Sequence, residues 1–209
     1  FETLAPSELW KEYYGGTDQT PWYRYLHRVL QLIQARRKKS GRWILKSPQH
    51  LEQFAPLSQV FPDATTVVTH RDPVSITASF ATMATYSARL SLETVDPVKV
   101  GGYWAKRIEE MLHACVQDRE LLAPERSLDV RFHEFMSDDM ATVAAIYALA
   151  DQPLDSAARG AMESFMQQHP RGKHGRVLYD LADFGLVEKE RRQALDFYSE
   201  RFGVVEERN

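Results

Sequence analysis

Apolar positions in the first part of the chain follow two different periods. From Pro21 to about Lys38 they recur every three to four residues, which predicts an amphipathic helix with cations at its C-terminal end. The short apolar runs Arg42–Lys46 and Ala64–Thr69 predict two buried strands, and the helical spacing between them predicts one helix that ends near Phe61. Because a single helix joins the two strands, they form a βαβ crossover and should be parallel.

The alternation of periods continues to the end of the chain. Asp72-Pro73 suits an N-cap and a first helical residue, and it predicts a helix that reaches about Leu90. The run Leu128–Phe132 predicts a third strand. Further helices are expected over Val95–Leu122, Asp139–Ala150, Asp155–Gln168 and Val187–Phe202. This order predicts an α/β fold in which helices cover both faces of a parallel sheet and ligands bind at the carboxyl ends of the strands.

Composition narrows the class of protein. The 209 residues suit a single domain, residues 1–209, and the net charge of −3 provides no general attraction to nucleic acid or to an anionic membrane. No run approaches the roughly 20 apolar residues that a membrane span needs. Cys115 is the only cysteine in the sequence, which excludes a disulfide within the chain and a multi-cysteine zinc site. We therefore expect a cytoplasmic protein without a metal cofactor, and the oligomeric state stays open.

Basic and hydroxyl side chains gather where the predicted strands end. Lys46 ends the first strand and His70-Arg71 ends the second, so parallel pairing would place all three side chains at one edge. The helix that follows offers free backbone N–H groups and the positive end of its dipole. Ser75 and Ser79 lie on one helical face, and an arginine fork with hydroxyls and amides suits a phosphate monoester. The alternative is an ordinary N-capped helix with Arg71 in a surface ion pair.

The first strand end suggests a transfer reaction. His50 falls in the first turn of the predicted helix, close to Lys46, and the pair suits transfer of a phosphoryl-like or sulfuryl group. Lys46 would stabilise charge on the leaving or bridging oxygen. His50 would take a proton from an attacking hydroxyl, and the neighbouring lysine would favour its neutral form. A histidine bonded to backbone at a helix start, beside a lysine that reaches into solvent, is the structural alternative.

A late segment, His169–Gly175, forms a third basic element. Its glycines allow the backbone to approach an anion closely, and Arg171, Gly172 and Lys173 are the candidate contacts. The segment is too irregular to be one face of a helix. A solvent-exposed loop is the alternative.

Together these elements resemble the sulfotransferase superfamily that uses 3′-phosphoadenosine 5′-phosphosulfate (PAPS) as sulfuryl donor. The stretch from Arg42 to Phe80 is similar to the broad, largely bacterial branch in its Lys-Ser-Pro-x-His unit and in its His-Arg-Asp-Pro unit, which has a serine eight residues after the arginine. The likeness continues through residues 130–151 and the late basic loop, and it extends over residues 22–203. It implies a P-loop-NTPase-like sheet flanked by helices, and sulfuryl transfer to a hydroxyl of a small-molecule, carbohydrate or lipid acceptor.

The resemblance implies a 3′-phosphate site. Arg71 and Ser79 match the residues that bind this phosphate in the family. The late loop, with Arg171, Gly172 and Lys173, resembles the family's basic glycine-containing phosphate loop and is expected at the same site.

The resemblance also implies a transfer site. Lys46 matches the lysine beside the transferred sulfuryl group. His50 is the candidate base, although well-studied cytosolic members carry this histidine two residues after the lysine and the present chain carries it four residues after. Phe132 or His133 is expected near the adenine.

One part of the family pattern has no counterpart in the sequence. Family members open with a strand and a Gly-rich loop that holds the 5′-phosphosulfate, and Tyr14–Thr17 lacks a strand before it and a helix after it in the required order. The sequence is therefore expected to be N-terminally incomplete, or to be a catalytically incomplete 3′-phosphonucleotide-binding module. A protein kinase is excluded, because Thr77 stands where an asparagine would follow His70-Arg71-Asp72.

Overall fold

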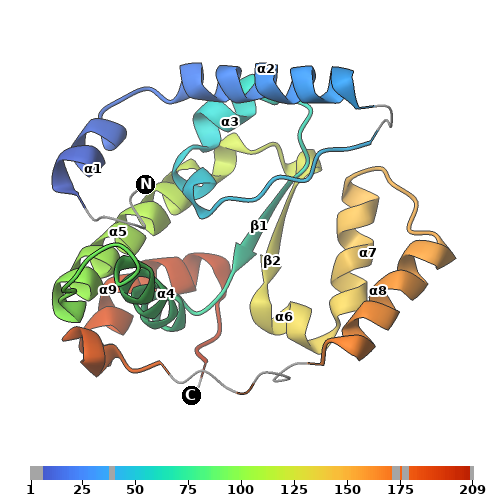
Figure 1. Ribbon diagram of the computed structural model, residues 1–209. Helices are drawn as coiled ribbons and strands as arrows, with labels where there is room; N and C mark the ends of the chain where they lie inside the picture. Colours follow the sequence, from blue (N-terminus) through green and yellow to red (C-terminus); the bar gives the residue numbers. More distant parts are fainter. Residues whose placement is uncertain (1–6, 38–40, 171–174, 176–178, 208–209) are drawn as a thin grey trace.

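Two parallel strands, β1 (Thr66–His70) and β2 (Ser127–Arg131), run side by side through the middle of the fold (Figure 1). Their register pairs the first residue of β1 with the first of β2 and the last with the last, so both carboxyl ends lie at one edge. The chain passes between them through α4 (Pro73–Ala88) and α5 (Pro97–Asp118). Such a crossover on one side of the sheet makes the strands parallel.

Helices lie on both sides of the two strands in this computed structural model, which describes residues 7–37, 41–170, 175 and 179–207. In Figure 1, α4, α5 and α9 lie on one side of the strands and α6, α7 and α8 on the other. The remaining bounds are α1 (Glu8–Gly15), α2 (Thr20–Arg36), η1 (Pro48–Glu52), α3 (Phe54–Val60), η2 (Arg119–Leu121), η3 (Pro124–Arg126), α6 (Phe132–Ser137), α7 (Asp139–Leu149), α8 (Ser156–Gln168), η4 (Leu181–Phe184) and α9 (Glu188–Phe202).

The main core forms where α4, α5 and α9 pack together beside β1. The helices predicted from three-to-four spacing of apolar residues are confirmed here, and their apolar positions face the core. The buried side chains include Val74, Ala78, Ile108, Leu112, Leu195, Tyr198 and Phe202. Gly101 of α5 permits a close approach to η4, because a Cβ added there would lie 2.4 Å from the Cβ of Phe184. The core therefore sits directly under the carboxyl edge of β1.

The strand predicted over Arg42–Lys46 is wrong. Residues 41–47 form neither helix nor strand and have no strand partner among the residues that the structure describes, and Ile44 is 93% exposed. A strand needs a neighbour for its backbone hydrogen bonds, and apolar character alone does not supply one. The single helix predicted after it is also divided, into η1 and α3. Proline in each of these short helices is confined to the first turn, where its missing N–H is tolerated.

The described residues also bear on two features noted from the composition, the lack of a long apolar run and the single cysteine. Within it, no helix is long and apolar enough to cross a membrane. Cys115 is fully buried in α5, and burial raises the pKa of its thiol to about 12, so the sulfur is an inert part of the core.

Candidate functional site

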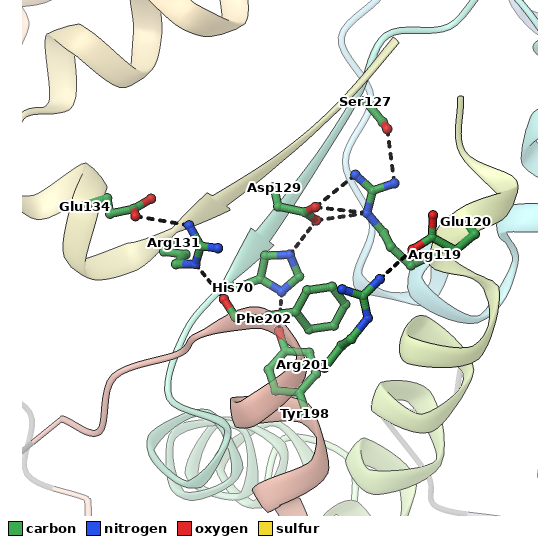
Figure 2. A network of polar contacts seen from close by, with 10 residues as sticks. All are labelled: His70, Arg119, Glu120, Ser127, Asp129, Arg131, Glu134, Tyr198, Arg201 and Phe202. Atoms are coloured by element: carbon green, nitrogen blue, oxygen red, sulfur yellow. Dashed lines mark hydrogen bonds and ion pairs between the residues drawn. The ribbon is translucent and has the colours of Figure 1, made fainter. Parts of the chain in front are cut away.

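His70, the last residue of β1, points into the core. Its Nδ1 lies 2.7 Å from the hydroxyl of Tyr198, its Nε2 lies 2.8 Å from Oδ1 of Asp129, and Phe202 stacks on its ring (Figure 2). The prediction that its imidazole joins the cations at the ligand edge is therefore wrong. Consecutive side chains of an extended chain point to opposite sides, so a buried His70 leaves Arg71 facing outward.

Asp129 connects this histidine to a buried arginine, Arg119. Arg119 donates from Nε and Nη2 to both carboxylate oxygens and from Nη1 to the hydroxyl of Ser127 (Figure 2). Burial would raise the pKa of Asp129, but the hydrogen bonds from His70 and Arg119 outweigh it and hold that pKa at about 2. The network ties both strands to α9 and to η2, and so it holds the strand end from which Arg71 projects.

Arg71 forms an ion pair with the carboxylate of Glu207. Its Nε and Nη2 donate to the two carboxylate oxygens of Glu207 at 2.6 and 2.7 Å, and its guanidinium lies 4.4 Å from the centre of the Phe132 ring. The side chain of Arg71 is 43% exposed. Of the two roles considered for this arginine, the ion pair is the one formed in the described chain.

Asp72 is the N-cap of α4 as predicted, and both oxygens of its carboxylate accept hydrogen bonds. It accepts hydrogen bonds from the amide of Val74, the hydroxyl of Ser75, the guanidinium of Arg192 and the amide of Glu207. Burial pushes the pKa of Asp72 upward, yet these bonds prevail and keep it below its usual value. Asp72 is thus an ionised anchor beneath the edge of the site.

The two serines of α4 differ in availability. Ser75 is buried and bonded to Asp72, whereas Ser79 is half-buried one turn further along the same face. A cavity of about 200 Å³ lies beside this helix, and its lining includes Ser75, Arg192 and Tyr179 together with apolar side chains of α4 and η4. A hollow with polar groups therefore lies next to the residue that follows Arg71.

Lys46 and His50 lie on the irregular part of the chain. Lys46 is exposed within residues 41–47, so the prediction that a strand end delivers it to the sheet edge is wrong. Ser47 caps η1 by accepting from the amide of Gln49, and this turn carries His50. The structure thus brings Arg71, Asp72 and the serines together by regular elements, while Lys46 lies in no such element.

The imidazole ring of His50 is held by the side chain of a tyrosine. Its Nδ1 lies 2.7 Å from the hydroxyl of Tyr23, a buried residue of α2. Burial lowers the pKa of His50, which favours neutral imidazole near pH 7; burial, and not the predicted charge of Lys46, is the cause. Burial also raises the pKa of Tyr23, so its phenol stays protonated. In the tautomer whose Nδ1–H donates to the Tyr23 oxygen, Nε2 has a lone pair that can accept a proton; in the tautomer whose Nδ1 accepts from the phenol, the proton lies on Nε2.

The remaining residues predicted for the site are the late basic loop, the two candidates for the adenine and the glycine-containing turn near the start of the chain. Arg171, Gly172 and Lys173 lie outside the described residues. Phe132 contacts Arg71, whereas His133 is exposed. Tyr14–Thr17 ends α1 and forms a turn with no strand before it in the described chain, in agreement with its rejection as the phosphosulfate loop.

Sequence reasoning missed the residues that complete the site. Glu207 is 136 positions from Arg71, and Arg192 is 120 positions from Asp72, so no local pattern connects them. Asp129 did leave a signal, because a lone carboxylate inside a strand requires a partner when the strand is buried. Tyr23 left none, since tyrosine is common on the buried face of an amphipathic helix.

The part of the chain that contains β1, β2 and α4 matches a known protein family. The model of the sulfotransferase family matches residues 9–156, which include both strands and the whole of the Arg71 segment. The chain belongs to the sulfotransferase family.

Individual sulfotransferases extend the likeness over most of the chain. The omega-hydroxy-beta-dihydromenaquinone-9 sulfotransferases Stf3 of Mycobacterium bovis and Mycobacterium tuberculosis are each 26% identical over 149 residues, covering 70% of this chain and 35% of theirs. The crystal structure of sulfotransferase STF9 from Mycobacterium avium superposes with a TM-score of 0.86 at 26% identity, covering 98% of this chain and 52% of that one. Sulfotransferase STF1 from Mycobacterium tuberculosis gives 0.75 at 29% identity, covering 92% and 49%.

In each comparison the match covers most of this chain but a much smaller share of the other protein. The chain spans about a third of the length of the curated relatives and about half of the length of the solved sulfotransferases. What the relatives do as whole proteins is therefore a guide to a proposal for this chain.

Proposed function

We propose that this sulfotransferase chain binds the 3′-phosphate of PAPS through Arg71 and contributes to transfer of the sulfuryl group to an acceptor hydroxyl. The observation that carries the proposal is the bidentate contact of Arg71 with the two oxygens of a carboxylate. A guanidinium oriented in this way matches two oxygens of a phosphate monoester equally well. The start of α4 lies directly beside it.

Several contacts of the chain fit a phosphonucleotide. Phe132 lies against the guanidinium of Arg71, and a contact of this kind lowers the conformational entropy that the side chain loses when an anion binds. Ser79 is half-buried on α4 and supplies a hydroxyl. The late loop with Arg171, Gly172 and Lys173 is proposed as a further contact on the strength of the family likeness alone.

Transfer is assigned to Lys46 and His50. PAPS supplies the sulfuryl group, and 3′-phosphoadenosine 5′-phosphate (PAP) is the product. Lys46, an exposed residue, would stabilise charge on the bridging oxygen. His50 would accept the hydroxyl proton of the acceptor on Nε2 while Tyr23 holds Nδ1. Among small-molecule, carbohydrate and lipid hydroxyls we propose a lipid hydroxyl first, because the curated relatives are named for a hydroxylated menaquinone derivative.

Calorimetric titration with PAP and with AMP tests the nucleotide site. Wild type should bind PAP more tightly than AMP, and Arg71→Ala should weaken PAP binding by about 10- to 100-fold, since a charge-assisted bidentate contact is worth roughly 1.5–3 kcal/mol. Arg71→Lys keeps the charge without the fork and should fall between them. Arg89→Ala removes an exposed arginine just after α4 and should bind as wild type does. Equal affinity of wild type for PAP and AMP would overturn the proposal.

A second candidate is a nucleotide-binding module without turnover. It is favoured by one observation, the exposure of Lys46, which lies in no strand or helix. Labelled-sulfate transfer from PAPS to a panel of lipid, carbohydrate and phenolic acceptors distinguishes the two. Preferential PAP binding with no transfer to any acceptor favours the module, and measurable transfer favours the enzyme.

A further inference from the structure

The segment that follows α9 is directed onto the strand ends by specific contacts. Gly203 adopts a left-handed conformation with φ of 63°, which reverses the chain at the helix end. Arg131, the last residue of β2, donates to the carbonyl of Phe202, as Figure 2 shows beside the buried His70 network. The amide of Val204 returns to the carbonyl of Ser199 at 3.0 Å. The path of residues 203–207 is therefore determined by the fold.

The segment ends at the arginine assigned to the phosphate. The amide of Glu207 donates to Asp72 at 2.9 Å, and its carboxylate meets Arg71 through both oxygens. Backbone and side chain of one residue thus bind two consecutive residues at the β1 edge. A carboxylate that receives two parallel N–H donors has the geometry of a phosphate held by the same fork.

We propose that Glu207 is a built-in competitor that occupies Arg71 in place of the nucleotide 3′-phosphate and is displaced when the nucleotide binds. The inference rests on the proposed function, in which Arg71 binds that phosphate. Glu207 therefore lowers the affinity of the site and opposes retention of PAP after transfer.

The chemistry of the guanidinium makes the two ligands exclusive. Glu207 uses Nε and Nη2 of Arg71, and Phe132 covers one face of the group. A phosphate approaching the remaining Nη edge would carry its negative charge next to the carboxylate of Glu207, and like charges in contact repel. Glu207 must therefore leave, or the phosphate binds weakly. The carboxylate can leave, because its side chain is 27% exposed and residues 204–207 belong to no helix or strand.

A pair of glutamine variants separates competition from support. Glu207→Gln removes the charge that faces Arg71, whereas Glu206→Gln removes the same charge from the neighbouring residue, whose carboxylate lies 3.7 Å from Arg192. Titrations with PAP and AMP are run on wild type, both variants and Arg71→Ala. Glu207→Gln should lower the PAP dissociation constant roughly threefold to tenfold, as expected for loss of one partly exposed ion pair, and should leave AMP binding unchanged. Glu206→Gln should stay near wild type.

Hydrogen exchange of wild type provides a second measurement that needs no variant. The peptide that contains residues 203–207 should exchange faster when PAP is added, because displacement exposes its amides.

The measurements distinguish failure of the competition by Glu207 from failure of the phosphate role of Arg71. If Arg71→Ala weakens PAP binding but Glu207→Gln leaves it unchanged or weakens it, Glu207 is not a competitor and the proposed function stands. Slower exchange of residues 203–207 with PAP has the same meaning. If wild type and all variants bind PAP and AMP alike, the phosphate assignment of Arg71 and the competition both fail. Tighter PAP binding by Glu207→Gln alone, with faster exchange in wild type, supports the competition.

Discussion

The two segments that carry the candidate chemistry are held by very different amounts of structure. Arg71 follows a strand that is hydrogen-bonded along its length, with His70 buried before it and Asp72 bonded to four groups after it. Lys46 is exposed in a segment that forms neither helix nor strand, and His50 is secured by one side-chain contact, from Tyr23. In the sequence both segments resemble family motifs, although His50 stands four residues after Lys46 and well-studied members have this histidine two residues after the lysine.

The difference separates binding from transfer. An anion-binding arginine gains affinity when its orientation is established before the ligand arrives, and the buried network behind β1 provides this. The Lys46–His50 segment lacks a sheet neighbour among the described residues, so its side chains are less constrained. Within this chain, the nucleotide half of the site is therefore more preorganised than the transfer half. The following substitutions test that difference, in order of decreasing effect on stability.

Asp129→Ala removes the carboxylate shared by His70 and Arg119. His70 and Arg119 then remain buried without the carboxylate to which they are bonded. The free energy of unfolding, measured by urea denaturation, should therefore fall by about 2–4 kcal/mol. Asp196→Ala replaces an exposed carboxylate on α9 and should change stability by less than about 0.5 kcal/mol. A loss below about 1 kcal/mol for Asp129→Ala would show that the network does not organise the strand end.

The same carboxylate predicts a loss of stability in acid. The pKa of Asp129 is about 2 in the folded protein and has an ordinary value of 3.8, so its stabilising contribution is complete above pH 3.8 and is lost as pH falls toward 2. Allowing for the 30% exposure of the side chain, this contribution is about 1–2 kcal/mol. Unfolding free energies measured from about pH 5 to pH 2 should decline more steeply in wild type than in Asp129→Asn. Equal slopes would contradict the prediction.

Tyr23→Phe tests the weaker support of His50. Loss of one part-buried hydrogen bond should lower the unfolding free energy by about 0.5–1.5 kcal/mol. Nitrogen NMR of the His50 ring should show one predominant tautomer in wild type and a mixture of tautomers in the variant. Tyr25→Phe changes an exposed tyrosine of the same helix and should affect neither measurement. An unchanged His50 spectrum in Tyr23→Phe would mean that the contact does not orient the ring.

Lys46→Ala should have the smallest effect on the fold. The residue is exposed and lies outside regular elements, so stability should change by less than about 0.5 kcal/mol. If the proposed transfer role is correct, sulfate transfer should still fall, by about 100-fold or more, because a charge that stabilises the transition state is lost. A large loss of stability would mean that the segment is more tightly held than its exposure indicates.

Prediction from the sequence succeeded where the determining contacts are local. The N-cap at Asp72, the proline after it and the apolar spacing of α4, α5 and α9 depend on residues a few positions apart. It failed over Arg42–Lys46, where an apolar run was taken as a strand, because sheet formation depends on a partner elsewhere in the chain. The same limit applies to His70, since its alternative positions at the ligand edge or in the core differ only through Tyr198 and Asp129.

The sequence by itself determined the α/β order, the helix that begins beside Arg71 and the family likeness, since each depends on spacing along a short stretch. Tertiary structure alone decided which groups hold that arginine. Glu207 is 136 positions away and Tyr198 is 128 positions from His70, so folding had to bring them together before either contact existed. The motif specifies a residue able to bind an anion, and long-range packing specifies that a carboxylate of the same chain is bound there.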